Sequence, residues 1–118
     1  MPNVLESRIL EIIDRLILIH PDDPDIIRYL YIITNLLLED EKETIYFLKN
    51  CEDEKIIYWI AALLDQVAAK FPSHELLSIL KSLINKFPGN EVSLLNFQIA
   101  INVTQEELSW LMNNSSKT

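Results

Sequence analysis

The sequence predicts an all-α protein of about seven antiparallel helices, in a single domain of residues 1–118. Three observations lead to this prediction. Glycine occurs once, at Gly89, which leaves few places for tight β-turns. The five prolines stand mainly between apolar runs. Apolar residues recur at intervals of three and four, and hydrophobic residues make up 49% of the chain, enough for one core.

Two helices are expected on either side of Pro21. An apolar stripe predicts the first from about residue 4 to residue 19, and Pro21 ends it, because the residue before a proline is disfavoured in a helix. Asp23 is suited to cap the second helix, and Pro24 fits its first position. The apolar part of this helix, residues 26–38, has only a thin polar strip, so we expect it to be the buried central helix.

The next three helices follow the same logic. Asp40 has capping-box spacing with Glu43 and opens a third helix over residues 41–50. A fourth, over residues 54–70, ends at a Phe-Pro pair. Ser73 caps a fifth, which ends at the Phe-Pro-Gly sequence of residues 87–89.

Two further helices complete the prediction. Asn90 caps a sixth helix that runs to about residue 102. Thr104 and Glu107 have the Thr-x-x-Glu spacing of a capping box, which predicts a seventh, short helix to Met112. Residues 113–118 are expected to be a flexible polar tail.

One short sequence occurs twice. Lys-Phe-Pro-x-x-Glu begins at Lys70 and again at Lys86, sixteen residues later. Two interpretations are open. Consecutive helices can share the same ending and capping chemistry, or the chain can form a short stack of antiparallel helix pairs that resembles HEAT-type solenoids.

The net charge of −8 is concentrated in one part of the chain. Residues 22–54 contain ten acidic and three basic residues, whereas residues 55–118 contain five of each. Such an excess argues against direct binding to nucleic acid or to an anionic membrane, and favours a basic protein partner.

No constellation of residues predicts catalysis. His20 and His74 stand at helix boundaries beside prolines, and the single cysteine, Cys51, is expected to be apolar filler. Asp22, Asp23 and Asp25 lack the spacing of a calcium loop, so a solvated turn is expected. We therefore expect a protein that is not an enzyme, with no metal and no cofactor.

The chain has no signal-peptide pattern and no apolar run of about 20 residues, which predicts a cytoplasmic protein.

The acidic residues and nearby aromatic residues are the candidate partner-binding site. Acidic residues that remain in water set the rate of association, and aromatic anchors supply affinity. Tyr58 is expected to be accessible, while Trp59 is assigned either to the core or to the interface. The candidate residues are Asp22, Asp23, Glu39, Asp40, Glu41, Glu52, Asp53, Glu54, Tyr58 and Trp59.

Part of the chain carries a family resemblance. The stretch from Cys51 to Val67, followed by Ser73-His-Glu-Leu-Leu and Ile79-Leu-Lys-Ser-Leu-Ile, has an acidic run, an aromatic pair and leucine-rich helices. It resembles the helical immunity proteins of bacterial polymorphic-toxin and contact-dependent inhibition systems, in particular the family numbered thirty. The likeness covers about residues 50–101 and implies that Glu52, Asp53, Glu54, Tyr58 and Trp59 contact the partner.

The resemblance implies an antitoxin that neutralises a cognate toxin domain. The acidic charge adds that this toxin has a basic surface, as an RNase or DNase has. Two other functions are left open: a helical-repeat adaptor or assembly subunit without a toxin partner, and a small enzyme or ligand-binding domain. The sequence does not identify the toxin, the mode of inhibition or the oligomeric state.

Overall fold

The computed structural model describes residues 4–115, and within this range it contains helices and no β-strand. The predicted all-α class is confirmed. The chain divides into two compact units, Met1–Ile60 and Ala61–Thr118. The expectation that residues 1–118 form one domain stays a prediction. No helix in the described part of the chain is both long enough and apolar enough to cross a membrane.

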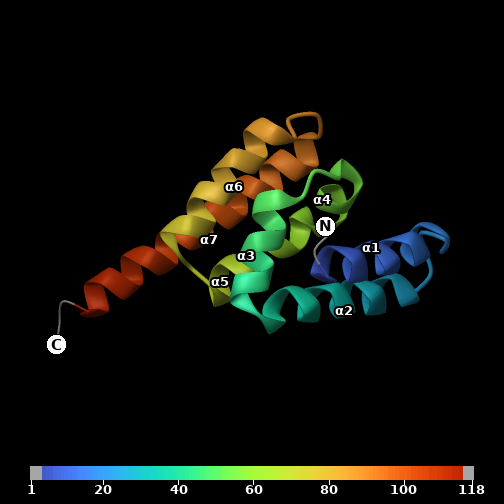
Figure 1. Cartoon of the computed structure of the whole chain (residues 1–118), viewed down its shortest axis with the longest axis horizontal. Helices are drawn as coiled ribbons and strands as arrows, with labels where there is room; N and C mark the ends of the chain where they lie inside the picture. The colour runs from blue at the N-terminus through green and yellow to red at the C-terminus, as the bar shows by residue number, and fades with distance from the viewer. Residues whose placement is uncertain (1–3, 116–118) are drawn as a thin grey trace. The chain divides into compact units, whose positions relative to one another are not determined.

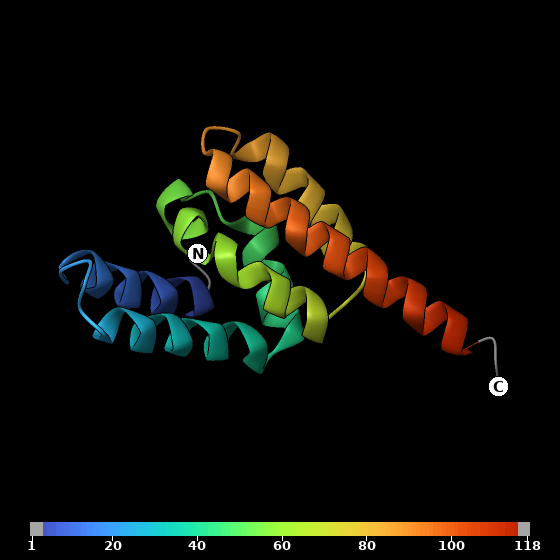
Figure 2. The ribbon, with the colours of Figure 1, turned by 180° about the vertical axis from the view of Figure 1, so that it is seen from behind.

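The first unit contains α1 (Val4–Ile17), α2 (Asp25–Glu39), α3 (Glu41–Asn50) and α4 (Glu54–Ile60). Helix α1 packs against the three others, and α2 also packs against α3. Figures 1 and 2 show α1 and α2 side by side along their length. The core of this unit is built from aliphatic side chains and one phenylalanine: Leu5, Ile9, Ile13, Leu16, Ile33, Leu37, Phe47, Leu48, Ile56, Ile57 and Ile60.

The prediction that residues 26–38 form the buried central helix is wrong. Helix α2 buries Ile33 and Leu37, but Ile27 and Tyr31 are 74% and 67% exposed. Helix α1, not α2, has neighbours on several sides. A thin polar strip in the sequence indicates how apolar a helix is, whereas its burial depends on how many elements pack around it.

The second unit contains a 3₁₀ helix (Ala61–Leu63), α5 (Leu64–Lys70), α6 (His74–Lys86) and α7 (Glu91–Ser115). Helix α7 packs along α5, α6 and the 3₁₀ helix. The predicted helix over residues 54–70 is therefore interrupted by one tighter turn. The core of this unit comprises Leu64, Val67, Ala68, Leu76, Ile79, Leu80, Leu83, Phe97, Ala100 and Ile101.

The predicted break between a sixth and a seventh helix is wrong, because α7 is continuous from Glu91 to Ser115. Thr104 is fully buried, and its Oγ1 donates a hydrogen bond to the Ala100 carbonyl at 2.8 Å. A threonine can satisfy its hydroxyl in this way inside a helix, and neither proline nor glycine interrupts this segment. Of the predicted tail, residues 113–115 are helical, and residues 116–118 lie outside the described range.

Three of the predicted helix caps are confirmed. Asp40 accepts a hydrogen bond from the Glu43 N–H, Ser73 from the Leu76 N–H, and Asn90 from the Ser93 N–H. Asp23 accepts one from the Asp25 N–H at 2.9 Å, but α2 begins at Asp25, so Pro24 is the N-cap residue and not, as predicted, the first helical residue. Helix α1 ends at Ile17, two residues earlier than predicted, because the amides of Leu18 and Ile19 bond three residues back in a tightened last turn.

The repeated Lys-Phe-Pro sequence ends α5 and α6 in the same way. The Phe71 N–H bonds to the Val67 carbonyl and the Phe87 N–H to the Leu83 carbonyl. Each preceding lysine places its Nζ 5.6 Å from the phenylalanine ring centre. Both copies of the repeat therefore end a helix with the same chemistry.

Candidate functional site

All ten predicted partner-binding residues lie in the first unit, at or beside three helix junctions. Glu39, Asp40 and Glu41 join α2 to α3, and Glu52, Asp53 and Glu54 join α3 to α4. Asp22 and Asp23 lie in the loop between α1 and α2, and Tyr58 and Trp59 lie on α4. The two acidic triplets are separated by the ten residues of α3, about 15 Å at 1.5 Å per residue. The first unit therefore has acidic residues at three helix junctions: α1–α2, α2–α3 and α3–α4.

Part of this acidity is helix-capping chemistry. Asp23, Asp40 and Asp53 each accept a hydrogen bond from a backbone N–H at the start of the following helix. Each carboxylate therefore stabilises a helix start and remains at least partly accessible to solvent. These three residues have a local structural reason to be acidic.

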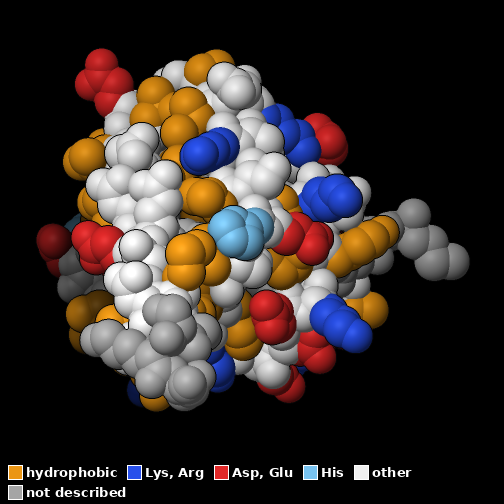
Figure 3. Space-filling view, turned by 90° about the vertical axis from the view of Figure 1, so that its left-hand side faces the viewer, with side chains coloured by type: hydrophobic (Ala, Val, Ile, Leu, Met, Phe, Trp, Pro, Cys, Tyr) orange, Lys and Arg blue, Asp and Glu red, His pale blue; other side chains and the backbone are white. Residues whose placement is uncertain are grey.

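Three of the other acids in the two triplets are more available to a partner. Glu39, Glu41 and Glu54 are exposed and form no ion pair among the described residues. Other acids of this unit do lie within ion-pair distance of a base, as in Glu11–Arg15, Asp25–Arg28 and Asp14–Lys55. The acidic residues do not cover every face: on the face in Figure 3, acidic and basic side chains are interspersed among apolar ones.

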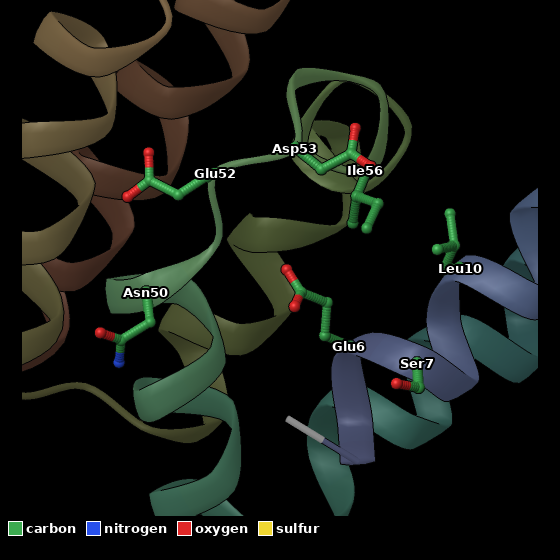
Figure 4. A pocket seen from close by; sticks show the side chains of 7 residues that line it. All are labelled: Glu6, Ser7, Leu10, Asn50, Glu52, Asp53 and Ile56. Atoms are coloured by element: carbon green, nitrogen blue, oxygen red, sulfur yellow. The ribbon is translucent and has the colours of Figure 1, made fainter. Parts of the chain in front are cut away.

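An acidic pocket lies between α1 and the turn that joins α3 to α4 (Figure 4). Its volume is about 460 Å³, and its lining consists of Glu6, Ser7, Leu10, Asn50, Glu52, Asp53 and Ile56. Three lining residues are carboxylates, and none is basic. In Figure 4 the Glu6 side chain rises from α1 toward the turn, whereas the Glu52 side chain extends from the turn away from α1.

Cys51 is buried in the same turn. Its Sγ lies 3.8 Å from the Asp53 carbonyl oxygen. Burial raises the pKa of the thiol to about 12, and the charges of Glu6 and Asp53 act in the same direction. The thiol is therefore protonated near neutral pH and is a poor nucleophile.

The chemistry of the acidic pocket suits a cationic side chain. Its carboxylates favour a positive charge, and Leu10 and Ile56 offer apolar walls to the aliphatic part of a lysine or arginine. No group of three His, Cys, Asp or Glu side chains among the described residues is arranged to hold a metal ion. This also applies to the aspartates of the α1–α2 loop.

The two residues of the aromatic pair differ in exposure. Tyr58 is 51% exposed, as predicted, and lies one turn after Glu54 on α4. Trp59 is half-buried, and its ring meets that of Tyr58 edge to face, with centroids 6.1 Å apart. Trp59 thus contacts Tyr58 and keeps part of its own surface accessible.

The sequence interpretation missed Glu6, Ser7 and Leu10 as lining residues of the pocket. Glu6 and Leu10 are four apart on α1, which places them on one side of that helix. No local signal relates them to Asp53, because only the packing of α1 against α3 and α4 brings these segments together.

Comparison of the chain with family models, with curated proteins and with solved structures gave no significant match. The resemblance of residues 50–101 to immunity proteins therefore stays a prediction.

Proposed function

We propose that the chain is a protein-binding helical domain of the immunity type, which binds and neutralises a toxin domain through a basic surface on that toxin. The observation that carries the proposal is the acidic pocket, with three carboxylates and no basic residue in its lining. A lysine or arginine from the partner would enter it, with its charge beside the carboxylates and its aliphatic stem along Leu10 and Ile56.

The exposed charges around the acidic pocket support the same proposal. Glu41 and Glu54 flank α3 and have no ion pair within residues 4–115, so a basic partner would meet them without breaking an existing contact. Tyr58 lies one turn beyond Glu54, and tyrosine is a frequent anchor of protein interfaces. Nucleases have basic surfaces because they bind phosphates, so an RNase or DNase is the proposed toxin class.

Reversal of the exposed charges tests the proposal. The probe is the product of the gene immediately upstream, co-expressed with this chain. We expect Glu41→Lys/Glu52→Lys/Glu54→Lys to slow association at least tenfold at low salt and to release the toxic activity, because attraction becomes repulsion.

A matched control has the same charge change in the second unit. Glu75, Glu91 and Glu106 are exposed, and the first two also stand in the first turn of a helix. Glu75→Lys/Glu91→Lys/Glu106→Lys should leave association nearly unchanged. Equal protection by both triple variants would contradict the electrostatic part of the proposal.

The alternative function is a helical adaptor or assembly subunit without a toxin partner. The exposed apolar side chains of α2 also suit this function, because such a protein binds through apolar or mixed surfaces. The two functions differ in salt dependence. A complex lost between about 0.1 M and 1 M salt, where the screening length falls from about 10 to 3 Å, favours the acidic interface.

A further inference from the structure

The outer side of α2 carries an apolar ridge, defined here by Ile27, Tyr31 and Leu38. These residues are four and eleven positions apart, so they lie within about 40° of one another around the helix. Ile27 and Tyr31 are mostly exposed, and Leu38 is half-buried. Ile33 and Leu37, on another side of α2, supply the core of the first unit.

A single exposed apolar residue is ordinary on a protein surface. An isoleucine and a tyrosine one turn apart are different, because together they form a continuous apolar strip on a rigid helix. Tyrosine is also enriched among the residues that dominate binding energy. The ridge therefore has the composition of the centre of a protein interface.

Both ends of the ridge are acidic. Asp22, Asp23 and Asp25 lie at its start, and Glu39, Asp40 and Glu41 lie at its end. The fifteen residues of α2 place these ends about 22 Å apart. Between Asp22 and Glu41 the only basic residue is Arg28, whose guanidinium lies 3.9 Å from the Asp25 carboxylate.

We infer that the ridge of α2 is a docking surface for a partner protein that has an apolar groove flanked by two basic clusters about 20 Å apart. The inference rests on the proposed function, and it names the surface where the toxin would be anchored. The acidic ends would orient the partner, and Ile27 and Tyr31 would bury apolar surface between them.

The same charges disfavour a second copy of this chain as the occupant. In an antiparallel pair of α2 helices, the acidic start of one would meet the acidic end of the other. In a parallel pair, like ends would meet. Both arrangements place carboxylates opposite carboxylates, which selects against self-association through this face.

Truncation of the ridge tests the inference. The double variant Ile27→Ala/Tyr31→Ala removes two exposed side chains, so we expect it to fold, which circular dichroism would verify. Binding to the co-expressed upstream gene product should weaken at least tenfold, mainly through faster dissociation, with the salt dependence of association unchanged. The matched control is Val92→Ala/Leu95→Ala on α7, where both side chains are also mostly exposed. This control should bind as the wild type does.

Each other outcome overturns the inference in a distinct way. A complex that forms with wild-type affinity in the ridge variant refutes the docking surface and leaves the proposed function standing. Failure of the wild-type chain to bind the upstream product refutes both. A wild-type dimer in light scattering that the ridge variant converts to a monomer assigns the ridge to a second copy.

Discussion

At the scale of single residues, Cys51 is a case in which the environment fixes the chemistry of a side chain. Cys51 is 1% exposed, and burial raises the pKa of its thiol from 9.0 to about 12. The carboxylate of Glu6 and the charge of Asp53 add to this, because a thiolate would be a further negative charge beside them. The residue therefore contributes to packing rather than to reaction.

We predict that this thiol makes the folded chain less stable as the pH rises from 9 toward 12. Below pH 9 both states keep the proton, so the contribution is constant. Above it the unfolded chain releases the proton and the folded chain retains it, which favours unfolding by at most about 1.4 kcal/mol per pH unit. Urea unfolding at pH 8 and pH 10 would measure the slope, and Cys51→Ala should lessen it. The two proteins differ only at residue 51, so identical slopes would contradict the prediction.

At the scale of secondary-structure elements, the continuity of α7 gives a sharp test, because a proline distinguishes one helix from two. If Thr104 capped a separate helix, Gln105 would be its first residue, a position that favours proline. In the continuous helix Glu91–Ser115 the same proline removes a hydrogen bond and clashes with the preceding turn.

We therefore predict that Gln105→Pro lowers the free energy of unfolding by about 3 kcal/mol or more. His74→Pro is the matched control, since His74 is the first residue of α6 and Ser73 before it is extended, with φ −157° and ψ 160°. His74→Pro should change the free energy of unfolding by less than about 0.5 kcal/mol. Urea unfolding followed by circular dichroism measures both, and similar losses in the two variants would argue against a continuous α7.

These elements also mark how far the sequence predicts the structure. The caps Asp40, Ser73 and Asn90 were predictable, because a cap depends on residues two or three positions away. Thr104 was not, because a threonine hydroxyl serves equally as a cap or as a donor to the carbonyl four residues back. For that residue the deciding factor was burial against neighbouring helices, which no local pattern records.

The candidate site divides in the same way. The acidic residues of the α3–α4 turn and the accessible Tyr58 were predictable from charge and helical spacing. Glu6 and the ridge of α2 were not, because both depend on which sides of α1 and α2 are covered by other helices. Sequence patterns thus give the composition of a surface, and tertiary packing decides its position.

At the scale of the whole molecule, the charge distribution opposes folding and favours binding. Residues 1–60 contain thirteen acidic and six basic residues, whereas residues 61–118 contain five and four. The ion pairs Glu11–Arg15, Asp25–Arg28 and Asp14–Lys55 are substantially exposed, so each contributes little to stability. Repulsion among the carboxylates of the first unit is therefore largely uncompensated in the free protein.

Glu39 concentrates this conflict, because it is an unpaired acid at the last position of α2, where the helix dipole favours a positive charge. We predict that Glu39→Gln raises the free energy of unfolding by about 0.5 kcal/mol at low salt. Salt screens the repulsion among carboxylates, so we expect the wild-type chain to become more stable between 0.1 and 1 M NaCl, and the variant to gain less. Thermal unfolding at both salt concentrations measures this. Glu75→Gln removes an acid from the favourable first turn of α6, so it should lower the free energy of unfolding at low salt.

Salt would then stabilise the free chain while it weakens the proposed complex, because the same carboxylates repel one another in the free chain and attract a basic partner in the complex. Destabilisation of the chain by Glu39→Gln would mean that this carboxylate has a favourable role in the fold itself.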